Sequence, residues 1–98
     1  MAEEVIKALT REIGGFSQVE KIILFGSRAR GDNGHFSDID IAIFGQIDDE
    51  TWSYICRLAD VEDDTIKTLL KIDLVRFEKV GEELQKSIME EGKILYER

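Results

Sequence analysis

Two neighbouring stretches decide the fold of this 98-residue sequence: Gly26-Ser27-Arg28-Ala29-Arg30-Gly31, and the run SDIDIAIF at residues 37–44. The apolar segment KIILF, residues 21–25, leads directly into Gly26. An apolar run that ends in a glycine predicts a buried strand followed by a tight turn and a short helix. Backbone amides at the start of a helix are free to bind an anion. The turn is therefore a candidate phosphate-binding site.

The second stretch carries two acids, Asp38 and Asp40, in an otherwise apolar strand. Side chains two residues apart in a strand lie on the same face. The isoleucines at 39, 41 and 43 then face the helices, and the two aspartates face the opposite, open side. A later apolar strand, IDLVRF at residues 72–77, carries a third acid, Asp73. Carboxylates gathered on one face predict a bound cation.

Periodicity and turn residues predict the remaining elements. We expect helices over residues 2–13, from 48 to about 60, and around Leu84 and Ile88, with Gly92 as the cap of the last one; residues 61–70 are ambiguous and partly helical. The resulting order is helix, strand, short helix, strand, helix, strand, helix. It predicts one α/β or α+β domain, residues 1–98, with a small mixed sheet flanked by helices.

Composition limits the classes of function. An apolar content of 43% predicts a folded globule. The second half, residues 48–98, carries 14 acidic and eight basic side chains, which disfavours direct nucleic-acid binding and suits a basic protein partner. Cys56 is the one cysteine, so a disulfide framework and a thiolate zinc site are excluded. The sequence shows no signal peptide and no long apolar run, so we expect a cytoplasmic protein without a membrane partner.

The candidate site can be argued from charge. If the strands that carry the three aspartates are neighbours, each pair of carboxylates about 5 Å apart repels by roughly 3 kcal/mol at an effective dielectric of about 20. Divalent cations would relieve this repulsion, and ligands that are all oxygen select Mg²⁺, or Mn²⁺, over zinc. Gly26 allows close approach of a phosphate, Ser27 offers a hydroxyl, and Arg28 or Arg30 can neutralise the outer phosphates, with a slight preference for Arg30.

A triphosphate held between such a turn and two metal ions is poised for in-line attack on its α-phosphorus. One ion lowers the pKa of the acceptor hydroxyl, and the other stabilises the pyrophosphate leaving group. The expected reaction is transfer of a nucleotide to an acceptor hydroxyl.

The spacing itself resembles a known signature. Gly26-Ser27, ten intervening residues and Asp38-Ile39-Asp40 resemble the motif of the DNA polymerase β-like nucleotidyltransferase superfamily. The short turn, the later Asp73 and the ending EGKILY, residues 91–96, are similar to the minimal nucleotidyltransferases, the MNT or MntA-type antitoxins. The resemblance implies that all three aspartates are metal ligands, that Asp73 is also a possible base, and that the Gly-Ser pair binds triphosphate.

The resemblance also implies a partner and a substrate. Proteins of this kind pair with a helical HEPN-type ribonuclease toxin, and some transfer AMP from ATP to a tyrosine of that toxin. The leading hypothesis is therefore a Mg²⁺-dependent protein adenylyltransferase that acts as an antitoxin. One alternative is a binding module that neutralises its partner by masking it. Another is a small-molecule nucleotidyltransferase of the aminoglycoside-modifying kind, which the lack of room for a second domain disfavours.

Overall fold

The computed structural model describes residues 2–34, 37–60 and 68–98. Within these ranges the strands form one sheet in the order β3-β2-β1-β4. Their bounds are Lys21–Phe25 for β1, Ile39–Phe44 for β2, Ile72–Arg76 for β3 and Lys93–Glu97 for β4. β1 runs antiparallel to β2 and to β4, whereas β2 and β3 are parallel. The predicted mixed sheet is confirmed, and the strands bearing the acids are neighbours.

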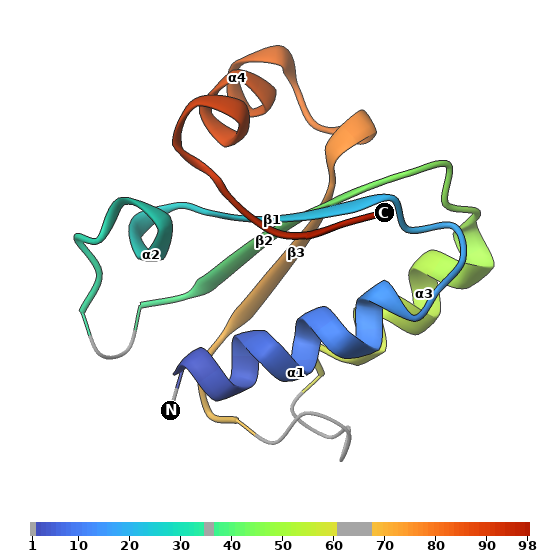
Figure 1. Ribbon diagram of the computed structural model, residues 1–98, viewed down its shortest axis with the longest axis horizontal. Helices are drawn as coiled ribbons and strands as arrows, with labels where there is room; N and C mark the ends of the chain where they lie inside the picture. The colour runs from blue at the N-terminus through green and yellow to red at the C-terminus, as the bar shows by residue number, and fades with distance from the viewer. Residues whose placement is uncertain (1, 35–36, 61–67) are drawn as a thin grey trace.

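Helices cover both faces of the sheet (Figure 1). They are α1 (Ala2–Gly14), α2 (Ser27–Arg30), α3 (Asp49–Arg57) and α4 (Glu82–Glu91), with a 3₁₀ turn at Phe77–Lys79. In Figure 1, α1 and α3 lie below the sheet, α4 lies above it, and α2 follows the end of β1. The order and type of these helices agree with the pattern in the sequence, although α3 ends three residues earlier and β2 begins two residues later than expected.

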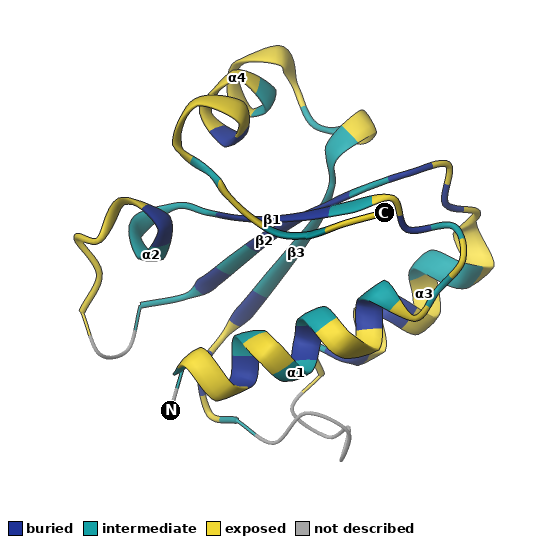
Figure 2. Ribbon diagram, in the orientation of Figure 1, coloured by how far each residue is buried: buried dark blue, intermediate teal, exposed yellow. Residues whose placement is uncertain are grey.

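Two hydrophobic clusters hold these layers together, and their buried residues follow the sheet and the inner sides of the helices (Figure 2). The larger cluster fills the space between the sheet and α1 with α3; its fully buried members include Leu9, Ile13, Ile22, Ile39, Ile41, Ile43 and Ile55. The smaller cluster joins Ile23, Ala42 and Ile88 beneath α4. β1 contributes to both clusters, so its unbroken apolar run is buried on both faces as expected.

The face that carries the aspartates is only partly open, which corrects one expectation. Ile88 of α4 packs with Ala42 of β2 and covers the far half of that face. Asp38, just before β2, and Asp40, at its beginning, lie outside the area that α4 covers and remain half-buried. The open part of the sheet is therefore confined to the end that holds the acids.

The final strand was not expected: the predicted order stopped at the last helix and its glycine cap. Gly92 does cap α4, and its N–H donates to the carbonyl of Ile88 at 2.9 Å. Residues 93–97 then form β4 along the edge of β1, with a shift of register between Ile22 and Ile23. This irregularity breaks the alternation by which a strand is recognised in a sequence.

Most of the segment at residues 61–70, which the sequence predicts to be partly helical, lies outside the described residues. In the part of the chain that the structure covers, no helix has the length and apolar character needed to cross a lipid bilayer.

Candidate active site

The turn after β1 brings the backbone against a carboxylate. Gly26 adopts a positive φ of 75°, and its carbonyl accepts hydrogen bonds from the N–H groups of Ala29 and Arg30, both at 3.1 Å. A Cβ at Gly26 would collide with the carboxylate of Asp40. Glycine is thus required twice, once for the backbone angle and once for space. The predicted phosphate-binding turn and the predicted metal ligands lie in contact.

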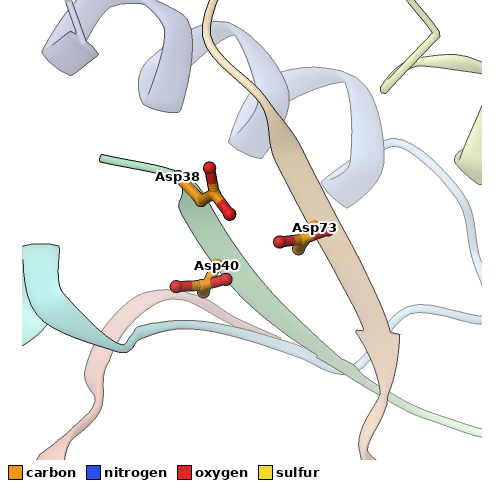
Figure 3. A group of neighbouring side chains, drawn as sticks. All are labelled: Asp38, Asp40 and Asp73. Atoms are coloured by element: carbon orange, nitrogen blue, oxygen red, sulfur yellow. The ribbon is translucent and has the colours of Figure 1, made fainter. Parts of the chain in front are cut away.

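The three aspartates meet at this end of the sheet (Figure 3). Asp40 projects from the start of β2, Asp38 projects from the residue just before it, and Asp73 projects toward both from β3. Asp40 and Asp73 are register partners in the parallel pair of strands. One oxygen from each of the three carboxylates lies within 4.8 Å of the others. The structure therefore brings together all three acids that the sequence singled out, and we refer to them as the carboxylate triad.

Burial, together with the crowding of negative charge, raises the pKa of Asp40 above its ordinary value of 3.8. Burial is the largest cause, followed by repulsion from Asp73 and Asp38 and by a hydrogen bond with Asp73. A nearby lysine, Lys71, acts in the opposite direction. The site thus holds anionic groups under repulsion, a condition that a bound cation would relieve.

The donor set fits a hard divalent cation. All three ligands are carboxylates, the oxygen donors that Mg²⁺ and Mn²⁺ accept in proteins. Oxygens that share one Mg²⁺ at about 2.1 Å lie at most about 4.2 Å apart. A separation of up to 4.8 Å therefore needs only small side-chain rotations to bring the triad within reach of one ion.

Lys71 is the residue at the triad that sequence reasoning missed. Its Nζ lies 4.0 Å from Oδ2 of Asp38 and 3.8 Å from Oδ1 of Asp73. One signal was available, because Lys71 is two residues before Asp73 and shares its face if the strand is extended one residue back. Lysines next to strands are common, however, so this signal is weak. The ion pair with Asp38 also forms only when β2 and β3 are neighbours.

Arg28 connects the turn to the segment that leads into β2. Its Nε and Nη2 donate to the backbone carbonyl of Ser37, at 3.1 and 2.8 Å. Ser37 immediately precedes Asp38, so Arg28 connects α2 to the base of the triad. The guanidinium therefore helps to hold the backbone next to Asp38 in place. Its contact with triphosphate stays a prediction.

Arg30 lies at the surface and points to a different helix. Its Nε donates to Asp32 at 3.2 Å, and its Nη1 donates to Glu91 of α4 at 3.0 Å. The slight preference for Arg30 over Arg28 as a triphosphate ligand therefore also stays a prediction, because either side chain would have to exchange partners to make that contact.

Comparison with known proteins agrees with this geometry. The family described as "Polymerase beta, Nucleotidyltransferase" matches residues 3–98. A protein of Methanocaldococcus jannaschii, named as a candidate protein adenylyltransferase, is 34% identical over 95 residues, which span 96% of this chain and 93% of that protein.

Two solved structures share the fold along the whole chain. A toxin–antitoxin complex with AMP-PNP contains a chain that is 28% identical, with a TM-score of 0.69, and the match covers 100% of this chain and 75% of that one. A mutant MntA toxin–antitoxin complex contains a chain that is 26% identical, with a TM-score of 0.67, and the match covers 100% of this chain and 74% of that one. The protein belongs to the polymerase β nucleotidyltransferase family, is similar to the nucleotidyltransferases of MntA toxin–antitoxin pairs, and is itself a nucleotidyltransferase.

Proposed function

We propose that this protein is a Mg²⁺-dependent adenylyltransferase that transfers AMP from ATP to a HEPN-type toxin and thereby acts as an antitoxin. The observation that carries the proposal is the carboxylate triad set against the Gly26 turn. The named adenylyltransferase relative supports the reaction, and the complex with AMP-PNP supports an adenosine nucleotide. The toxin–antitoxin neighbours support a toxin as the acceptor.

Each group at the site has a part in the proposed reaction. The turn at Gly26 and Ser27 binds the triphosphate, and the triad holds the metal ions. When bound, divalent ions supply a lowered pKa for the acceptor hydroxyl and stabilisation for the leaving pyrophosphate. Asp73 takes the hydroxyl proton as the acceptor oxygen bonds to the α-phosphorus. The bond from that phosphorus to the bridging oxygen breaks, and pyrophosphate leaves.

The exposure of the triad supports a macromolecular acceptor. The side chains of Asp38 and Asp73 are 43% and 40% exposed, so a hydroxyl on the surface of another protein can approach them directly. α4 covers only the far half of this face and leaves the triad accessible.

The test is the intact mass of the helical partner after incubation with this protein, ATP and Mg²⁺. We expect one or more AMP units to be added, and the variant Asp38→Asn/Asp40→Asn to slow the addition at least about 100-fold. Asp49→Asn/Glu50→Gln removes two carboxylates at the start of α3, on the other face of the sheet, and is expected to leave the rate unchanged. A stable complex whose partner keeps its mass would reject the enzyme in favour of a masking module.

A further inference from the structure

Lys71 is held at the triad by the backbone and not only by its side chain. Its carbonyl accepts a hydrogen bond from the N–H of Ile39, at 2.9 Å. This bond joins the residue before β3 to the first residue of β2, directly after Asp38. The ammonium then reaches across the gap between Asp38 and Asp73. As long as β2 and β3 stay paired, this hydrogen bond keeps Lys71 close to the triad.

The ammonium lies beside two of the three carboxylates that would hold a divalent cation. Oδ2 of Asp38 lies 4.0 Å and Oδ1 of Asp73 lies 3.8 Å from Nζ of Lys71. A metal ion at these carboxylates would stand a few ångströms from the ammonium, and two cations at that distance repel each other. The lysine side chain is 70% exposed and flexible, so it can leave the triad for water without breaking the fold.

We propose that Lys71 is an exchangeable counter-ion of the triad. In the metal-free protein its ammonium offsets the repulsion among the carboxylates, and a divalent cation must displace it to bind. Lys71 therefore lowers the affinity of the triad for the free metal ion and stabilises the fold before the metal arrives. This inference rests on the metal site of the proposed function.

The first test is Mn²⁺ binding to the nucleotide-free protein, with free Mn²⁺ followed by electron paramagnetic resonance. We expect Lys71→Met to bind Mn²⁺ roughly three- to tenfold more tightly than the wild type. The metal ion no longer has to break two exposed ion pairs, and the expected change reflects the small free energy of such pairs. Lys71→Arg keeps the charge and is expected to bind like the wild type. Lys86→Met is the matched control, because Lys86 is 77% exposed and lies 4.0 Å from Glu90, away from the triad.

The second test separates this role from simple packing. In EDTA, Lys71→Met is expected to melt at a lower temperature than the wild type, because the repulsion is no longer offset. In saturating Mn²⁺ the two are expected to melt together. A lower melting temperature in both conditions would assign Lys71 a structural role and overturn the inference, as would unchanged or weaker Mn²⁺ binding by Lys71→Met. A wild type that binds no Mn²⁺ would instead overturn the metal site on which both proposals stand.

Discussion

At the scale of single residues, Gly26 occupies a position that both its backbone angle and its neighbours restrict. Its φ of +75° lies in the left-handed region, which costs other residues roughly 1–2 kcal/mol. The space beside its Cα is also taken by the carboxylate of Asp40. A side chain at Gly26 would therefore strain the turn and push one acid away from the other two.

Gly31 provides a control for the backbone contribution. It also has a positive φ, of 85°, but no atom lies within 4 Å of where its Cβ would be. We expect Gly31→Ala to lower the free energy of unfolding by about 1 kcal/mol and Gly26→Ala to lower it by about 2–4 kcal/mol. Urea denaturation measures both. Equal losses would show that the contact with Asp40 is easily relieved.

At the scale of elements, β4 depends on the absence of a side chain at the end of α4. Gly92 has an ordinary φ of −72°, so its conformation does not require glycine. A Cβ there would collide with the Cγ2 of Ile23 and with the carbonyl of Ile88. The chain can pass from α4 onto the edge of β1 only because nothing projects at this position.

Gly92→Ala is therefore expected to separate β4 from β1 or to shift α4, at a cost of about 2–4 kcal/mol in the free energy of unfolding. Gly81→Ala is the control, because Gly81 begins the same helix and has no atom within 4 Å of its Cβ position. Because alanine is a poorer N-cap than glycine, this substitution should cost about 0.5–1 kcal/mol. Denaturation curves compare the two, and similar midpoints would contradict the steric argument.

The start of α3 should make stability depend on pH. Asp48 caps the helix: its Oδ1 accepts from the N–H of Thr51 at 2.7 Å, and its Oδ2 accepts from Nε2 of Gln18 at 2.8 Å. These bonds, that from Gln18 most, hold the pKa of Asp48 below its ordinary 3.8. A lowered pKa in the folded state stabilises the protein above pH 3.8, and the stabilisation is lost as pH falls through the folded pKa.

Asp48→Ala is accordingly expected to melt well below the wild type at pH 7, with the gap shrinking as pH falls below 3.8. Glu50→Ala removes a carboxylate from the same turn and leaves both hydrogen bonds of Asp48 in place, so it should lower the melting temperature less. Thermal melts across this pH range decide the point; a gap that persists undiminished at low pH would mean that the cap does not depend on ionisation.

At the scale of the whole molecule, the triad exists only when separate parts of the chain have docked. The carboxylates come from the residues at and just before the start of β2 and from β3, two strands that are distant in sequence and adjacent in the sheet. A cation bound by all three favours the folded state alone. Mg²⁺ at ten times its dissociation constant should then raise the free energy of unfolding by about 1.4 kcal/mol, or the melting temperature by roughly 7 °C.

The control for this effect is ionic strength, because the chain has a net charge of −8 and any salt weakens its self-repulsion. NaCl at matched ionic strength should give a smaller rise than Mg²⁺ in the wild type. Asp38→Asn/Asp40→Asn should respond equally to both salts. A variant that keeps the full Mg²⁺ effect would place the ion elsewhere on the acidic surface.

Local pattern was sufficient for the parts of the site that are close in sequence. The apolar run before Gly26 predicted β1 and the turn after it, because a glycine is needed where a strand turns sharply into a helix. The spacing of Asp38 and Asp40 placed both on one face, because side chains in a strand alternate with a period of two. These features depend on covalent geometry and neighbouring residues, so no other part of the chain was needed.

Tertiary structure alone decided the contacts between distant segments. Asp73 faces Asp40 because β3 docks parallel to β2 in one register, and a shift by one residue would turn its carboxylate to the other face. β4 is a strand because β1 offers an edge to it, although its own pattern is irregular. Lys71 reaches the triad through the same register. Local pattern determined which residues lie on each face of a strand. The free energy of packing the strands together determined which of these residues come into contact.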